Sequence, residues 1–142
     1  MRQKILYKII IIASLVGLII SSYLTYNYYT KNNAICIINQ EKSCDFVLNG
    51  IYSELLFDIP NSILGIIGFL IFIILCYISM NLKEMNNLIF YVSLIAFLFV
   101  LFLAYLVFFV ISSFCLWCFV VWMLIIAIFI CSIFLIKNKI RY

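Results

Sequence analysis

The stretch MNNLIFYVSLIAFLFVLFLAYLVFFVISSFCLWCFVVWMLIIAIFICSIFLI, residues 85–136, contains no charged side chain and decides the fold class of the protein. As one helix it would be roughly 78 Å long at 1.5 Å per residue. The hydrocarbon core of a bilayer is about 30 Å thick and takes ~20 helical residues to cross. The stretch must therefore fold back once, and the polar pair Ser112 and Ser113 near its midpoint is the only reasonable turn.

Two further uncharged segments precede this stretch, residues 9–30 and residues 59–82. The second is entered through Pro60, a residue that suits the first turn of a helix. The composition also indicates a membrane protein, because 69% of the residues are apolar and only 10% are charged. In soluble domains about a quarter of the residues are charged. We predict a single-domain, all-α integral membrane protein over residues 1–142, with helices of about 9–30, 60–82, 87–111 and 115–136 and a long extracytoplasmic loop between the first two. The expected surroundings are membrane lipid, and no nucleic-acid partner is expected.

The basic residues predict the orientation of the four crossings, since cytoplasmic flanks are enriched in lysine and arginine. One side of the membrane receives seven basic residues: Arg2, Lys4, Lys8, Lys83, Lys137, Lys139 and Arg141. The other side receives Lys31 and Lys42 together with four carboxylates. We therefore expect a multi-pass protein of the cell membrane with both termini in the cytoplasm, and with the loop of residues 31–58 outside.

The basic start MRQKILYK also allows a cleaved signal peptide. However, the apolar run that follows is too long, and SSYLTYNYYT (residues 21–30) offers bulky tyrosines where a signal peptidase needs small residues. Tyrosines at this position fit an interfacial aromatic belt. We expect the first segment to remain as a membrane anchor.

The six cysteines divide into two groups under this topology. Cys76 and Cys131 fall deep in the second and fourth helices, where small apolar core residues are expected. Cys36, Cys44, Cys115 and Cys118 fall on the extracytoplasmic side, where disulfides persist.

Three interpretations of the four outer cysteines remain open. An all-thiolate zinc site is one, although such sites usually pair two close-spaced motifs and Cys36 and Cys44 are eight residues apart. Two structural disulfides are another, although a CxxC ring at a helix start is easily reduced, and a helix N-terminus lowers thiol pKa values. The third is an electron relay, in which a loop dithiol exchanges with the CxxC dithiol and a lipid-soluble quinone accepts the electrons.

The order of these motifs carries a resemblance over almost the whole chain. The pair in CIINQEKSC (36–44) is followed by VLNGIYSELLFDIPNSILG (47–65) and by CLWC (115–118) at the start of the last helix. This resembles the vitamin K epoxide reductase family in its small prokaryotic form, without a fused thioredoxin-like domain. The unrelated bacterial quinone-coupled disulfide oxidase has the two motifs in the reverse order.

The resemblance implies a four-helix bundle with a quinone of the menaquinone, ubiquinone or phylloquinone type at its centre. By position, Cys118 would face the quinone and Cys115 would form a transient disulfide with Cys44. Cys36 would receive electrons from a thioredoxin-like extracytoplasmic protein. Since the chain stops at Tyr142, shortly after the fourth helix, we expect this partner to act in trans.

Two further residues are expected to contact the quinone on the strength of the resemblance. Asn61 matches a helix-two asparagine that in animal members bonds the quinone carbonyl, and otherwise is a polar helix start. Trp122 occupies the place of a helix-four tyrosine and shares a helix face with Cys118, four residues before it; ordinary aromatic packing is its alternative role. Gly50 departs from the family, which usually has serine there.

The resulting functional prediction is a membrane thiol-disulfide oxidoreductase that couples disulfide formation in extracytoplasmic proteins to reduction of a membrane quinone. The alternative is a non-enzymatic metal-binding or structural membrane subunit. Small residues at Ala13, Gly17 and Ser21, and at Ser62, Gly65 and Gly68, predict close helix packing in either case.

Overall fold

The computed structural model describes residues 2–30, 59–82, 85–111 and 116–140 of the chain. These residues form α1 (Arg2–Thr30), α3 (Asn61–Asn81), α4 (Asn86–Tyr105), the π-helical continuation η3 (Leu106–Ile111) and α5 (Leu116–Ile140). Four helices are long and apolar enough to cross a membrane. The predicted four-helix membrane fold is confirmed. The loop between α1 and α3 and the turn at Ser112 and Ser113 lie outside the described residues.

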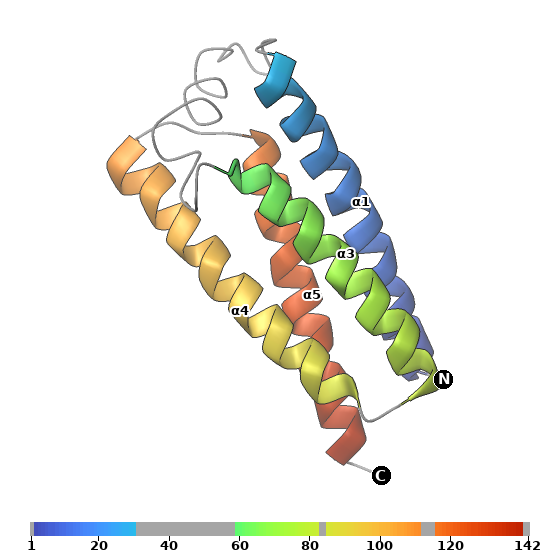
Figure 1. The fold of residues 1–142 in the computed structure, drawn as a ribbon. Coiled ribbons are helices and arrows are strands. Elements are labelled where there is room, and N and C mark those ends of the chain that lie inside the picture. The colour runs from blue at the N-terminus through green and yellow to red at the C-terminus, as the bar shows by residue number, and fades with distance from the viewer. Residues whose placement is uncertain (1, 31–58, 83–84, 112–115, 141–142) are drawn as a thin grey trace.

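The four helices run up and down beside one another as a bundle (Figure 1). α1 packs against both α3 and α5, and α4 packs along α5. The remaining edge, between α3 and α4, is the most loosely closed of the four, and α4 diverges from α3 toward the end where η3 lies (Figure 1). The bundle is therefore tight at one end and open at the other.

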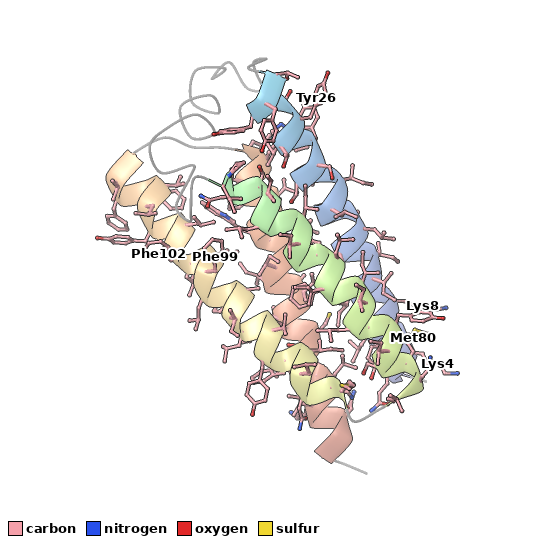
Figure 2. All side chains as sticks on the ribbon, viewed as in Figure 1. Lys4, Lys8, Tyr26, Met80, Phe99 and Phe102 are labelled. Atoms are coloured by element: carbon pink, nitrogen blue, oxygen red, sulfur yellow. The ribbon has the colours of Figure 1, made fainter. Side chains whose placement is uncertain are left out.

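The tight end carries the beginning of α1 and the short α3–α4 connection. Lys4 and Lys8 lie at the same end of the bundle as Met80 near the end of α3, whereas Tyr26 lies toward the opposite end (Figure 2). The Leu82 N–H donates to the Ile78 carbonyl at 2.9 Å, and the Met85 N–H donates to the Leu82 carbonyl at 3.2 Å. The basic residues of α1 thus mark the connected end of the bundle.

Two helices extend beyond the apolar spans expected from sequence. α1 begins at Arg2 instead of near residue 9, and α5 continues to Ile140 instead of ending near residue 136. The added turns contain Lys4, Lys8 and Lys137. A hydropathy argument measures only the part of a helix that lies in hydrocarbon, and lysine stems can continue the same helix into the interface.

The surface of the bundle is that of a lipid-embedded protein. Large apolar side chains stand exposed on every helix, among them Ile19, Ile74, Ile95, Phe109 and Ile133. A surface this apolar is not compatible with a monomer in water. The structure and the composition together make this a multi-pass membrane protein in contact with lipid.

One contact explains the closeness of α1 and α3. A Cβ atom on Gly17 would overlap the ring of Phe69, which is itself fully buried. The glycine therefore forms the recess into which the Phe69 ring inserts. This is the close packing predicted from the small residues of these two helices.

Buried polar side chains at the tight end bond to one another. Tyr7 and Ser79 both donate to Asn86 Oδ1, the serine at 2.7 Å, and the Tyr7 and Ser79 oxygens are 3.2 Å apart. We call Tyr7, Ser79 and Asn86 the polar clamp, since they join α1, α3 and α4. Ser93 and Ser132 similarly join α4 to α5, with their hydroxyl oxygens 2.7 Å apart.

Candidate functional site

A cavity of about 400 Å³ occupies the open end of the bundle. Its volume is in the range of pockets that hold small organic ligands, ≈ 300–1,000 Å³. All four helices contribute to its wall, and most of the lining is apolar: Leu24, Leu64, Phe69, Phe72, Val92, Ile95, Phe99, Val100, Leu103, Leu106, Val107, Val121 and Ile125. A cavity of this kind suits a largely apolar molecule.

α5 contributes one reactive group and one aromatic donor to the cavity. Cys118 lies in the first turn of α5, as predicted for the second cysteine of CLWC, and is half-buried. Trp122 follows one turn later and is 7% exposed. Both residues line the cavity, which confirms that they share one face of the helix.

Trp122 is held in place by neighbouring aromatic packing. Its ring lies 6.0 Å from that of Phe108 in η3, at an interplanar angle of 57°. Leu106 and Val107 of the same π-helical segment are buried in the cavity wall. π-helical turns are rare and are frequently found at functional sites, and here the segment forms the part of the wall that faces Trp122.

Asn61 enters the cavity from a second helix. It is the first residue of α3, directly after Pro60, whose backbone is extended and whose carbonyl accepts the Ile63 N–H at 2.9 Å. Pro60 and Asn61 both line the cavity. The structure therefore brings Asn61, Cys118 and Trp122 together around one cavity, from two different helices.

Phe69 of α3 links the cavity to the tight packing of the bundle. It lines the cavity and inserts into the recess at Gly17. Phe72, one turn further along α3, is also fully buried in the wall. Phe69 therefore connects the cavity wall to the close α1–α3 contact.

The cavity reaches the lipid-facing surface between α3 and α4. Ile95 lines the cavity and still exposes 68% of its surface. Across from it, a Cβ atom on Gly68 would meet no atom within 4 Å. Phe99 of α4 also lines the cavity, whereas the next turn's Phe102 is half exposed (Figure 2). A ligand dissolved in the bilayer could enter by this route.

The other predicted cysteines do not all fall within the described residues. Cys36, Cys44 and Cys115 lie outside them, although Cys115 immediately precedes α5. Cys76 is fully buried and Cys131 is half-buried against the hydrophobic core, on α3 and α5. These two belong to the core, as expected for them. Within the described residues, no group of three metal-binding side chains occurs.

Sequence reasoning missed two features of the site. Ser21, Ser62, Gly65 and Gly68, which it assigned only to helix packing, all line the cavity. It also gave no indication of the π-helical segment η3. The signal for these four residues was present as the small-residue pattern, but the pattern alone cannot distinguish a residue that faces another helix from one that faces an open space.

One comparison with known proteins identifies a relationship. The model of the Vitamin K epoxide reductase family matches residues 8–133, most of the chain. No curated protein matches the chain.

Proposed function

Since the chain belongs to the vitamin K epoxide reductase family, we propose that it couples disulfide formation in extracytoplasmic proteins to the reduction of a membrane quinone. Family membership supports a membrane oxidoreductase in general. The observation that carries the finer proposal is the cavity, because it brings the thiol of Cys118 together with Asn61 and Trp122 and opens toward lipid.

The residues around the cavity fit a quinone ring. A quinone is flat and apolar apart from its carbonyl oxygens, and the wall is apolar apart from a few polar side chains. The Trp122 indole N–H and the Asn61 amide are hydrogen-bond donors. Each would contribute about 1 kcal/mol to binding in such a site. We propose that these two side chains orient the ring with its edge toward Cys118.

The proposed reaction moves two electrons and two protons. A thioredoxin-like protein in trans would reduce the Cys36–Cys44 disulfide and leave with its own disulfide. Cys44 would attack the Cys115–Cys118 disulfide, form a bond to Cys115 and release the Cys118 thiolate. Cys36 would then attack Cys44, which restores the loop disulfide and releases Cys115. The Cys115–Cys118 dithiol would reform its disulfide as the quinone takes up both electrons and two protons to become the hydroquinone.

The proposal is tested by separating electron entry from quinone reduction with two variants. Cys36→Ser should stop electron entry from the protein partner, yet leave most quinone reduction by a small dithiol that reaches the CxxC pair directly. Cys118→Ser should abolish quinone reduction with either reductant. The measurement is quinone absorbance with purified protein in nanodiscs. Equal losses in both variants with both reductants would favour a structural role for the cysteines.

The proposed orientation places the termini in the cytoplasm and the redox cysteines outside, because the flanks of the four spans divide the basic residues seven to two. Lys4 and Lys8 lie at the connected end of the bundle (Figure 2). In intact cells treated with reductant, a membrane-impermeant thiol reagent should label Cys36 and Cys44. Labelling that requires permeabilised cells would reverse the orientation and remove the oxidising compartment on which the proposal depends.

A further inference from the structure

Ser21 of α1 has a hydroxyl group that makes no hydrogen bond to the residues that the structure describes. Its neighbours on the same helix bond back to the preceding turn: Ser22 to the Leu18 carbonyl at 2.8 Å, Thr25 to the Ser21 carbonyl at 2.8 Å and Thr30 to the Tyr26 carbonyl at 2.9 Å. This is the usual way in which a hydroxyl is satisfied inside a membrane helix. The Ser21 hydroxyl, in contrast, makes no such bond to a described residue.

The position of Ser21 is inside the bundle and on the cavity. The residue is 2% exposed and lines the cavity wall. Tyr28 and Ser62, the other hydroxyl residues of the wall, are only half-buried. A buried hydroxyl without a partner is unfavourable, so the Ser21 hydroxyl calls for an explanation. Ser14 of the same helix also has an unpartnered buried hydroxyl, but it does not line the cavity.

Gly65 of α3 determines where the Ser21 hydroxyl lies. A Cβ atom on Gly65 would be 2.8 Å from Ser21 Oγ, so a larger residue there would require the hydroxyl to turn away from this place. Gly65 follows Asn61 by four residues, one helical turn along the same face of α3. Ser21 therefore lies one turn deeper than Asn61, just as Trp122 lies one turn deeper than Cys118.

Resting on the function proposed above, we infer that Ser21 is a further ligand-contacting residue of the quinone site, bonded to the carbonyl that is remote from Asn61. The two carbonyl oxygens of a para-quinone lie on opposite sides of the ring, roughly the ~5.4 Å of one helical turn apart. A ring with one oxygen at the level of Asn61 has its second oxygen at the level of Ser21 and Trp122. A carbonyl oxygen accepts two hydrogen bonds, so both side chains can serve it.

Ser21 can do what Trp122 cannot. An indole N–H only donates a hydrogen bond, whereas a serine hydroxyl both donates and accepts. When the quinone has been reduced, its oxygen carries a hydrogen that needs an acceptor. Ser21 can rotate its hydroxyl to accept that hydrogen, and so bonds both the quinone and the hydroquinone.

The test compares Ser21→Ala with Ser22→Ala, an adjacent serine on the lipid-facing side of α1 whose hydroxyl is bonded within the helix. Binding of a short-tailed menaquinone and of its hydroquinone is measured in nanodiscs by isothermal titration. Ser21→Ala should weaken the binding of both forms about fivefold, which is about 1 kcal/mol. Ser22→Ala should change neither, and Trp122→Phe should weaken mainly the quinone form.

Two additional readouts separate a ligand contact from a structural role. In infrared difference spectra of the bound quinone, Ser21→Ala should shift one carbonyl band to higher frequency, because a hydrogen bond to that carbonyl is lost. Thermal stability of the quinone-free protein should be unchanged or higher, since the substitution removes an unpaired buried hydroxyl. A loss of stability without ligand would instead make Ser21 a packing residue and overturn the inference.

The outcomes distinguish this inference from the function on which it rests. If the unmodified protein shows no saturable menaquinone binding, the proposed function fails and the inference fails with it. If the unmodified protein binds menaquinone while Ser21→Ala and Ser22→Ala behave alike in affinity and in the infrared spectrum, the inference alone is wrong.

Discussion

The two ends of the bundle differ in what the oxygen atoms of their buried polar side chains face. At the connected end, the polar clamp residues Tyr7, Ser79 and Asn86 bond to one another across three helices. At the open end, Ser21 and Trp122 line a cavity of about 400 Å³ instead of bonding to neighbouring helices. Polar groups that satisfy one another stabilise a fold, whereas polar groups that face a cavity are available to a ligand.

This contrast predicts which residues determine the stability of the fold and which determine the affinity for a quinone. Substitutions at the connected end should change the free energy of unfolding and leave quinone affinity alone. Substitutions around the cavity should do the reverse. Two glycines test the same contrast sterically, because Gly17 of α1 receives the Phe69 ring and Gly68 of α3 faces open space.

The largest effect is expected for Gly68→Leu. Because a Cβ atom there meets nothing within 4 Å, the new side chain should extend into the cavity without a clash and occupy the space of the ligand. Quinone affinity should fall a hundredfold or more, about 2.8 kcal/mol, while the unfolding free energy stays within error. Gly68→Ala is the matched control and should retain most of the affinity. Unchanged binding in Gly68→Leu would place the ligand elsewhere.

Gly17→Ala should have the opposite outcome. The added methyl group would overlap the Phe69 ring, and overpacking of a core typically costs about 2 kcal/mol. Reversible unfolding in detergent micelles measures the loss. A variant as stable as Gly68→Ala would show that the Phe69 ring moves aside freely and that the two glycines are equivalent.

A smaller loss of stability is expected for Asn86→Ala in the polar clamp. The substitution removes the acceptor of two hydrogen bonds between helices. Such bonds contribute modestly in membrane proteins, so we expect a loss of about 1.5 kcal/mol. Quinone affinity should remain that of the unmodified protein. A change in affinity larger than the change in stability would show that the connected end also determines ligand binding, which contradicts the contrast between the two ends.

The smallest effects are expected for the proposed carbonyl ligands. Asn61→Ala and Trp122→Phe should each weaken quinone binding several-fold, about 1 kcal/mol, and should leave unfolding unchanged. Isothermal titration in nanodiscs is the measurement. If neither variant differs from the unmodified protein, the positions carried over from the family are wrong, although the cavity itself could still bind a quinone.

The sequence predicted the connected end and the fold better than the cavity. Uncharged runs of sufficient length are enough to predict four crossings, because every backbone group in lipid must be satisfied within a helix. The start of α3 was predicted within one residue from Pro60, which the structure places directly before Asn61. The position of Cys118 in the first turn of α5 followed from the turn required near Ser112.

The cavity could not be predicted, because it depends on how the helices are rotated and spaced. Ser21, Gly65 and Gly68 are all small residues in the sequence, but one bears an unpartnered hydroxyl, one makes room for it and one faces open space. The π-helical segment Leu106–Ile111 contains neither proline nor glycine, so no residue in it marks the widened turn. Such features arise from packing between helices and not from local preference.

The central claim is that a quinone ring lies in this cavity beside Cys118, and photoaffinity labelling tests it most directly. A photoreactive short-tailed menaquinone is bound to the protein in nanodiscs, cross-linked by light and located by mass spectrometry. The predicted label falls on cavity-lining positions of α3 and α5, between Asn61 and Phe72 and between Cys118 and Ile125, and excess unmodified menaquinone abolishes it. Label confined to outward-facing residues such as Ile19 or Ile74, or label that menaquinone does not displace, would contradict the account.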